Sequence, residues 1–282
     1  MGILNVTPDS FSERGRYFDK KAAIQRGLEL EREGADLLDI GGESTRPGAL
    51  PVDTEEEMDR TIPVIESLRN KGLRIPVSID TYKAQVAERA LQAGAEIVND
   101  VSGLRYDSSM AGIVARARAS IILMHLRGTP RSMQQLAPVQ DIVATVRKGL
   151  AGSLRQALRA GVRKTRIVLD PGIGFGKTAA QSFELLGALH RVANLGYPVL
   201  AGPSRKSFLR ASIIQPLSTQ GHSSPGKSVA ERSREVLPEE LLLGTAAALT
   251  AAILNGAHIV RVHDVRQMIP VAQVADRFLQ TK

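Results

Sequence analysis

Cysteine and tryptophan are missing from this 282-residue chain, and aromatic residues make up only 4% of it. Without cysteine there is no disulfide bond, no cysteine-ligated zinc and no thiolate nucleophile. Apolar residues account for 43% and charged residues for 23%, an ordinary balance for a globular protein. A chain of this length can bury a full hydrophobic core. The composition agrees with a cytoplasmic location.

Targeting and membrane signals are also missing. Residues 1–12 lack the positively charged and then apolar order of a secretory signal. Val6 stands where N-myristoylation requires Ser or Thr. The longest apolar run, residues 241–254, is shorter than the ~20 residues of a membrane span and is rich in small residues. We expect a buried helix there and no membrane partner.

The net charge of +8 has two interpretations. One is a nucleic-acid binder. The other is an arginine-rich, solvated surface with a site for an anionic small molecule. The basic residues are scattered over helical stretches, and no helix-turn-helix or RNA-binding signature is present. The second interpretation is therefore favoured, with no nucleic-acid partner.

A unit of helix, glycine and strand recurs along the chain. An amphipathic stretch ends at a glycine, and a short apolar run follows that closes on a polar residue. Glycine ends a helix in the left-handed conformation without a Cβ clash. The apolar run is too short for a helix and is typical of a strand buried on both faces. The glycines of these units are Gly34, Gly72, Gly94, Gly161, Gly196 and Gly256.

Two further apolar runs lack the glycine and bring the expected strands to eight. The expected strands are residues 2–6, 37–41, 75–80, 96–100, 120–125, 166–170, 197–202 and 258–263. Helical patterns separate them, including one with Val86 and Ala90 on one face and one that begins near Pro238. This order predicts an α/β protein with a (β/α)8 TIM barrel that spans residues 1–282 as a single domain. An open, doubly wound sheet is the alternative.

Residues 213–238 interrupt this rhythm. They form a polar segment rich in Ser, Pro and Gly. The composition predicts an extended loop between the seventh strand and its helix. Such a loop either covers a site at that end of the barrel or is a passive insertion.

Polar residues stand at the carboxyl ends of the expected strands, where barrel active sites are built. A buried carboxylate without a partner is costly, so the set implies a polar ligand. For any one residue, helix capping or a loop hydrogen bond is an alternative role. The residues are Asn5, Asp39, Asp80, Asn99, Asp170, Arg261 and His263.

The glycine run LDPGIGFGKT, residues 169–178, resembles a phosphate-binding loop only at first sight. A Walker A motif that ends at Gly176-Lys177-Thr178 requires glycine at position 171, which is Pro171. The spacing also differs from the G-x-G-x-x-G dinucleotide fingerprint. We interpret the run as a tight turn after Asp170, beside a flat ligand.

Seven segments of the chain, in order, closely resemble the hallmark segments of the dihydropteroate synthase family. They are MGILNVTPDSFS (1–12), DIGGESTRPGA (39–49), SIDTYK (78–83), IVNDVSG (97–103), LDPGIGFGKT (169–178), GPSRKSF (202–208) and RVHDV (261–265). The resemblance implies a TIM-barrel transferase of folate biosynthesis. Its reaction condenses 6-hydroxymethyl-7,8-dihydropterin diphosphate with 4-aminobenzoate to give 7,8-dihydropteroate and diphosphate. It also implies a cytoplasmic homodimer and a sulfonamide target.

The resemblance further implies residue roles. Pterin binding falls to Asp80, Asn99, Met124, Asp170 and Lys206. Aminobenzoate binding falls to Thr45, Arg46, Pro47, Phe175, Lys206 and Ser207. Diphosphate binding falls to Asn5, Arg261 and His263, with Asn5 also holding Mg²⁺, and the residues expected to act in catalysis are Lys206, Arg261, His263 and Asp80.

The strand pattern supports part of this assignment. Arg261 and His263 are two residues apart on one expected strand, so their side chains share a face, while Val260 and Val262 take the other. A pterin-dependent methyltransferase of the corrinoid-linked type is the alternative function. It shares the pterin-binding carboxylate and amide but lacks the MGILNVTPDSF, SRKS and RVHDV set.

Overall fold

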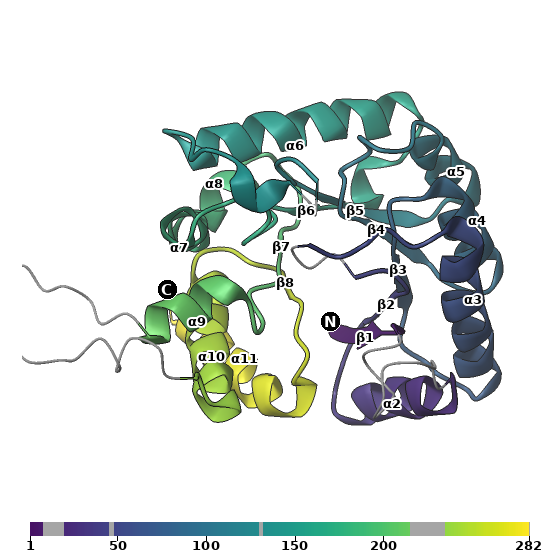
Figure 1. Ribbon diagram of the computed structural model, residues 1–282, viewed down its shortest axis with the longest axis horizontal. Coiled ribbons are helices and arrows are strands. Elements are labelled where there is room, and N and C mark those ends of the chain that lie inside the picture. The colour runs from purple at the N-terminus through teal and green to yellow at the C-terminus, as the bar shows by residue number, and fades with distance from the viewer. Residues whose placement is uncertain (8–19, 45–47, 130–131, 215–234, 282) are drawn as a thin grey trace, which may run out of the picture.

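Parallel strands occupy the centre of the molecule and helices surround them (Figure 1). The structure is a computed structural model, and it describes residues 1–7, 20–44, 48–129, 132–214 and 235–281. The strands are β1 (Gly2–Asn5), β2 (Leu38–Gly41), β3 (Val77–Asp80), β4 (Ile97–Asp100), β5 (Ser120–Met124), β6 (Ile167–Asp170), β7 (Leu200–Ala201) and β8 (Ile259–Val260).

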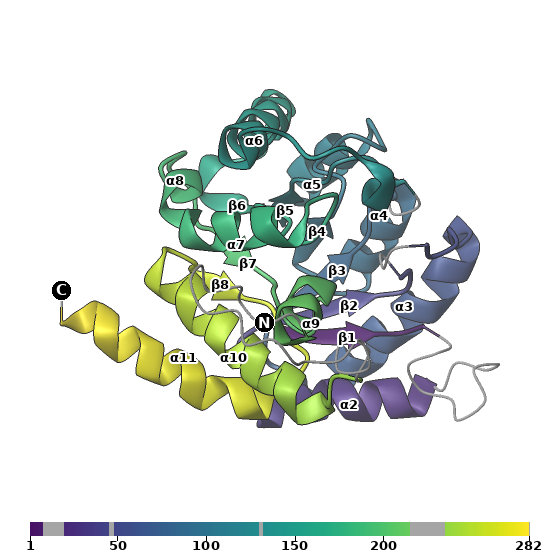
Figure 2. The ribbon, with the colours of Figure 1, turned by 60° about the vertical axis from the view of Figure 1, so that its left-hand side comes forward.

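Helices alternate with these strands and pack around them (Figure 2). The α-helices are α2 (Lys20–Arg32), α3 (Thr54–Asn70), α4 (Ala84–Gln92), α5 (Met110–Ala117), α6 (Ile142–Arg159), α7 (Ala179–Gly187), α8 (Leu189–Ala193), α9 (Ser207–Ile214), α10 (Pro238–Leu254) and α11 (Val265–Gln280). Two short 3-10 helices, η1 (Met133–Gln135) and η2 (Lys164–Arg166), lie in the connections.

The strands close into the expected (β/α)8 barrel. Strands β1 to β6 pair in chain order as one parallel sheet, and β7 pairs with β8 in parallel. Two single parallel bridges join the pieces, one between Leu169 and Val199 and one between Gly2 and Val262. The second bridge is flanked by hydrogen bonds from Ile3 N to Val262 O (3.0 Å) and from Val262 N to Met1 O (3.0 Å). The last strand therefore meets the first, and the open-sheet alternative is wrong.

Glycine ends the helices as the sequence predicts. All of the glycines that precede the expected strands have positive φ, from +83° at Gly72 to +109° at Gly94. Pro238 is the first residue of α10, where proline lacks only an N–H that a helix start leaves unpaired. These local signals set where each helix stops and the next strand begins.

Each strand has an outer and an inner face, and the outer face builds the main core. Outward-facing residues such as Leu38, Ile79 and Leu123 are buried against the helices. The inner face holds a small apolar cluster that fills the barrel toward the amino ends of the strands. Its members and the partly buried residues packed on it are Met1, Ile122, Leu200, Leu37, Ile97, Val168 and Ile259.

The segment after β7 differs from the expectation. A helix, α9, follows β7 directly, and Ile213 and Ile214 are its last residues. The polar segment therefore lies between α9 and α10 and not between a strand and its helix. Residues 215–234 lie outside the described residues.

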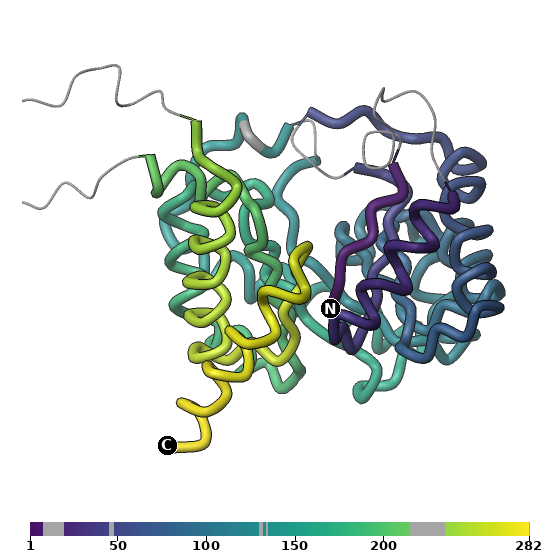
Figure 3. The backbone as a smooth tube through the Cα atoms, turned by 90° about the horizontal axis from the view of Figure 1, so that it is seen from below, coloured from purple at the N-terminus to yellow at the C-terminus, as the bar shows by residue number. Residues whose placement is uncertain are grey.

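Helix α10 contains the apolar run 241–254, and it packs on one side only. Leu241, Leu249 and Ile253 are buried, whereas Leu243 is 69% exposed. No helix in the described part of the chain is long and apolar enough to cross a membrane. Helices α10 and α11 lie side by side on one flank of the molecule (Figure 3).

Candidate active site

Inside the barrel, the polar residues at the strand ends form a layer on the carboxyl-terminal side of the apolar cluster. Residues two apart on a strand point to the same face, and five of the seven apolar interior residues are followed two positions later by a residue of the polar layer or by Met124. The pairs are Leu37 and Asp39, Ile97 and Asn99, Ile122 and Met124, Val168 and Asp170, and Ile259 and Arg261. The upper layer thus gathers at the carboxyl ends of the strands, where TIM-barrel active sites lie.

Arg261 joins two carboxylates across this layer. Its Nε donates to Asp39 Oδ2 (2.6 Å), and its Nη2 donates to Asp80 Oδ2 (2.8 Å). Asn99 Nδ2 also donates to Asp39 Oδ2 (3.0 Å). The structure therefore brings Asp80, Asn99 and Arg261 together, as the sequence predicts. It adds Asp39, a strand-end residue to which no role was assigned, as the carboxylate that links them.

Three acceptor oxygens in this network are buried and have no hydrogen-bond partner. They belong to Asp39 (Oδ1), Asp80 (Oδ1) and Asn99 (Oδ1). Leaving a buried acceptor unpaired costs about 1–3 kcal/mol, and more for a charged group. An arrangement that keeps several such acceptors on one face is suited to a ligand that supplies N–H donors.

Burial changes the ionisation of the acidic residues. Desolvation raises the pKa of Asp80, and the positive charge of Arg261 opposes this rise. Desolvation likewise raises the pKa of Asp170, with Lys206 as the main opposing charge. The negative charge on both residues therefore depends on neighbouring cations, which are part of the same site.

Lys206 follows β7 and reaches across to the loop after β6. Its Nζ donates to the Ile173 carbonyl and lies 4.4 Å from the centre of the Phe175 ring. Burial lowers the pKa of Lys206 to about 8, although the charge of Asp170 acts in the opposite direction. A lysine whose pKa is close to neutral pH, placed among candidate ligand-binding groups, is typical of a functional site.

The glycine loop after β6 requires its glycines for steric reasons. Gly172 has φ +65°, and a Cβ there would lie 2.1 Å from the backbone oxygen of His125. A Cβ on Gly176 would lie 2.5 Å from Arg127 O. This close packing lets the Gly172 N–H donate to Asp170 Oδ1 (2.7 Å). The tight turn after Asp170 agrees with the sequence interpretation, and the structure adds that its backbone holds the Asp170 carboxylate.

Lys177 has a role that the sequence interpretation missed. Its buried Nζ donates to three backbone oxygens, on Gly172 (2.8 Å), Phe175 (2.9 Å) and His125 (3.0 Å). The ammonium therefore ties the glycine loop to the backbone at the end of β5. Its Gly-Lys-Thr context is typical of phosphate binding, whereas the carbonyls that it contacts come together only in the folded loop.

An apolar wall lies beside the polar layer. Met124 packs with Val101, Leu126 and Met133, and the rings of Tyr82 and Phe175 lie against this cluster. The Tyr82 hydroxyl donates to Glu43 Oε1 (2.7 Å). The structure thus places Met124 and Phe175 on one wall of the site, next to Lys206.

The remaining expected residues are less central. His263 Nδ1 lies 3.1 Å from Ser204 Oγ, which also accepts from the His263 backbone N–H. Asn5 is half-buried at the end of β1, and Ser207 is exposed at the start of α9. Thr45, Arg46 and Pro47 lie outside the described residues.

Charged side chains hold the backbone on either side of residues 45–47. Lys83 Nζ bonds to Glu43 and to the buried Glu57 at the start of α3, and it also donates to Val52 O (2.7 Å). One lysine thus connects the described residues before and after that stretch.

The donor set limits how a metal could be held. In the described ranges, no group of three or more His, Asp or Glu side chains is arranged to bind a metal ion. Asn5 supplies a single amide oxygen at the end of β1. That fits Mg²⁺ only in a form that keeps its waters and takes other ligands from a substrate phosphate.

Comparison with known proteins agrees with this geometry. A family described as pterin binding enzyme matches residues 1–263. The chain is 45% identical over 276 residues to a dihydropteroate synthase from Synechocystis, with 98% of this chain and 88% of the relative covered.

Two solved structures extend the comparison. A dihydropteroate synthase from Clostridium difficile, determined in the presence of pteroic acid, is 42% identical with a TM-score of 0.85, and 99% of this chain and 95% of that chain are covered. A Yersinia pestis dihydropteroate synthase in a sulfonamide drug complex is 34% identical with a TM-score of 0.86, and the coverage is 99% and 94%.

Proposed function

This chain belongs to the dihydropteroate synthase family of pterin-binding enzymes, and it condenses a pterin diphosphate with 4-aminobenzoate. From this premise, we propose which residues bind each substrate and which act in the reaction. Asp80, Asn99 and Asp170 hold the pterin ring. The supporting observation is the set of buried acceptors without donors on Asp80 and Asn99. The amino group and ring N–H of a pterin lie side by side, so one carboxylate accepts both. We assign that role to Asp170.

Met124 lies against the flat face of the ring in this proposal. It belongs to the apolar wall that continues from the end of β5. Lys206 donates to the pterin carbonyl with an ammonium N–H that the Ile173 carbonyl does not use. The buried acceptors of Asp80 and Asn99 make the site selective for a pterin. An analogue that lacks one of the N–H donors leaves a buried acceptor without a partner, which weakens its binding.

The aminobenzoate ring lies between Phe175 and Lys206 in this proposal. The Lys206 ammonium lies 4.4 Å from the centre of the Phe175 ring, so the two side chains are neighbours, and a ring between them requires one of them to move. Ser207 and the segment with Thr45, Arg46 and Pro47 meet the carboxylate end. We expect a sulfonamide to compete for the same place.

The diphosphate meets Arg261 and His263, with Asn5 beside it. Arg261 bonds to Asp39 and Asp80 in the structure, so we propose that pterin donors compete for these carboxylates and leave the guanidinium available for phosphate oxygens. When bound, Mg²⁺ neutralises part of the diphosphate charge, and Asn5 is the side chain proposed to hold it.

The reaction follows from these positions. The C–O bond to diphosphate breaks, and positive charge on the methylene carbon spreads into the electron-rich ring. Arg261 and His263 stabilise the diphosphate, which gains negative charge as it leaves, while Lys206 orients the pterin through its carbonyl. The arylamine is neutral at pH 7 and forms the new C–N bond, then releases a proton to water. The mechanism needs no general base to activate the amine, because the amine is already nucleophilic.

We also propose that the chain is a single-domain, cytoplasmic homodimer. Exposed apolar side chains on α10 and α11 support an interface there: Leu243, Val274 and Phe278 are 69%, 58% and 57% exposed. Val274 and Phe278 are four residues apart on α11 and share a face. The end of α11 lies at the periphery of the molecule, where a second copy has access (Figure 3).

An assay of product formation tests the proposed residue roles. The protein is mixed with the pterin diphosphate, 4-aminobenzoate and Mg²⁺, and 7,8-dihydropteroate is measured. We expect turnover, with kcat/KM strongly reduced in Arg261→Ala. Full turnover in Arg261→Ala contradicts the leaving-group assignment. No turnover by folded wild-type protein contradicts the proposed function itself.

A further inference from the structure

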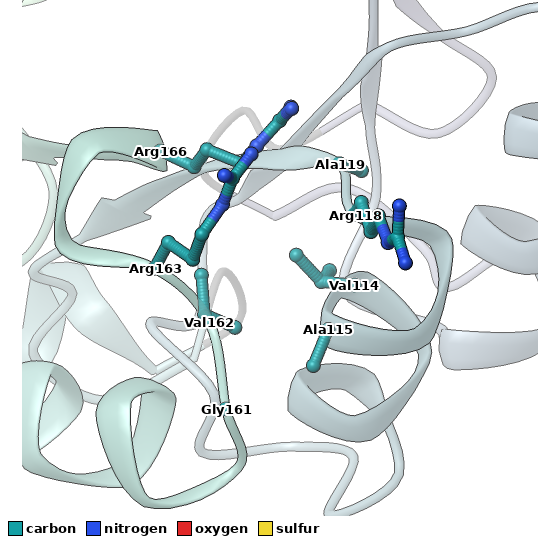
Figure 4. Close-up of a pocket in the computed structure, with 8 residues that line it drawn as sticks. All are labelled: Val114, Ala115, Arg118, Ala119, Gly161, Val162, Arg163 and Arg166. Atoms are coloured by element: carbon teal, nitrogen blue, oxygen red, sulfur yellow. The ribbon is translucent and has the colours of Figure 1, made fainter.

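A cavity lined by arginines lies at the opposite end of the barrel from the candidate active site. It has a volume of about 430 Å³ and is partly open to solvent. It lies between the end of α5 and the connection from α6 to β6, at the amino ends of β5 and β6 (Figure 4). Arg118, Arg163 and Arg166 line it, together with Val114, Ala115, Ala119, Gly161 and Val162.

The guanidinium groups of Arg118, Arg163 and Arg166 have no partner in the described part of the chain. None of them forms a salt bridge or a side-chain hydrogen bond there, and no carboxylate lines the cavity. The Nε of Arg166 is buried without an acceptor. By contrast, Arg116 on the last turn of α5 lies 3.7 Å from Glu88.

Arg118 and Arg163 are exposed and Arg166 is partly buried, so water screens part of the repulsion among these three charges and an anion relieves the rest. A buried N–H without an acceptor adds a further unfavourable contribution. Both are relieved by a ligand with several negatively charged oxygens, because a planar guanidinium bonds phosphate oxygens in a bidentate manner. The volume lies within the usual range for small-molecule sites.

We propose that this arginine-lined cavity binds a phosphorylated small molecule. Its phosphate groups meet Arg163 and Arg166, and Arg118 contributes further positive charge at the rim. Its apolar or aromatic portion lies against Val114 and Val162, which belong to the uncharged part of the lining (Figure 4). A nucleoside diphosphate has this combination of groups.

The site is separate from the active site. Strand β6 runs from beside Arg166 to Asp170, so about four residues of strand, or roughly 13 Å, separate the two ends. A ligand in the cavity therefore does not occupy the pterin or diphosphate positions proposed above.

The test measures binding of ADP to the full chain by calorimetry at 0.15 M salt. Three proteins are compared: wild type, Arg163→Met/Arg166→Met, and the matched control Arg32→Met/Arg155→Met. The control removes the same charge from exposed arginines outside the cavity. We expect ADP to bind wild type and control alike and the cavity variant at least tenfold more weakly. Arg163→Met alone, at an exposed position, is expected to weaken binding severalfold.

A competition and an activity measurement complete the design. We expect saturating pteroic acid to leave ADP binding unchanged and the cavity variant to keep its synthase activity, which shows that it is folded. Equal weakening in the control, displacement of ADP by pteroic acid, or no ADP binding to wild type overturns the proposal. Absence of synthase activity in the wild-type protein would contradict the proposed function and not the cavity proposal, because the comparison of ADP binding does not depend on turnover.

Discussion

The two ends of strands β5 and β6 carry opposite polar chemistry. At the carboxyl ends, acceptors lack donors: Asp80 and Asn99 each have a buried oxygen without a partner. At the amino ends, the Arg166 Nε is a buried donor without an acceptor, and the exposed Arg163 beside it has no anionic partner among the described residues. Unpaired acceptors suit a ligand rich in N–H groups, and unpaired donors suit an anion. The kind of group left unpaired thus indicates the kind of ligand at each end.

Replacing Asp170 is the strongest way to break this comparison at the active-site end. Asp170→Asn replaces the carboxylate that we propose accepts hydrogen bonds from two pterin donors. Hydrogen bonds to charged groups contribute about 1.5–3 kcal/mol each, so we expect kcat/KM to fall roughly 10²–10³-fold. Steady-state kinetics measures the effect. The control Asp276→Asn changes an exposed residue on α11, and an equally small effect of both variants contradicts the pterin assignment.

Gly172→Ala tests whether the fold depends on glycine in the loop after Asp170. The added Cβ meets the His125 carbonyl oxygen at 2.1 Å and forces a left-handed backbone on alanine. We expect the free energy of unfolding to fall by about 3 kcal/mol, measured by urea denaturation. The matched control is Gly187→Ala on α7, where nothing lies within 4 Å of the added Cβ. We expect the control to be neutral or stabilising by up to about 1 kcal/mol. Similar destabilisation in both variants shows that the loop is not the cause.

Lys177→Met tests whether Lys177 positions the glycine loop. The change leaves three backbone oxygens without their donor. We expect kcat/KM to fall by about 10–30-fold, equivalent to about 1.4–2 kcal/mol. Lys148→Met, at an exposed position on α6, is the control. If Lys177→Met loses stability but keeps kcat/KM under conditions in which it is fully folded, the lysine is structural only.

The pH dependence of activity sharpens the role of Lys206. Burial lowers its pKa to about 8, so its ammonium is present below that pH and is lost above it. We expect kcat/KM to decline above about pH 8, by about tenfold per pH unit once the lysine is neutral.

Folding stability provides the control for that decline. A lysine with a lowered pKa binds fewer protons when folded than when unfolded, so this residue makes the fold more stable as pH rises from about 8 toward its usual 10.5. Loss of activity in this window is therefore not caused by this group destabilising the fold. In Lys206→Arg we expect lower activity but a decline shifted to higher pH. An unshifted decline assigns the titration to another group.

Much of the barrel was predictable because its signals are local. Each helix-ending glycine before an expected strand has positive φ, and Pro238 begins α10. The alternation along strands also placed Arg261 inside the barrel, opposite the outward-facing Val262.

The contacts within the site were not predictable from local patterns. Arg261 bonds to Asp39, which is 222 positions away in the sequence. The three carbonyls that surround Lys177 come from backbone that only the tertiary fold brings together. Helix α9 was missed because its eight residues lie between β7 and a polar segment that dominated the composition. Strand β7 is also shorter than its apolar run suggests.

A crystal structure of this protein with bound pterin tests the central claim most directly. We predict that the pterin ring lies on the carboxyl-terminal side of the apolar cluster inside the barrel. Its N–H donors are then within hydrogen-bonding distance of Asp80, Asn99 and Asp170. We also predict that Arg261 has moved away from at least one of its two carboxylates. A pterin bound elsewhere, with the Asp80 and Asn99 oxygens still unpaired, would contradict the account.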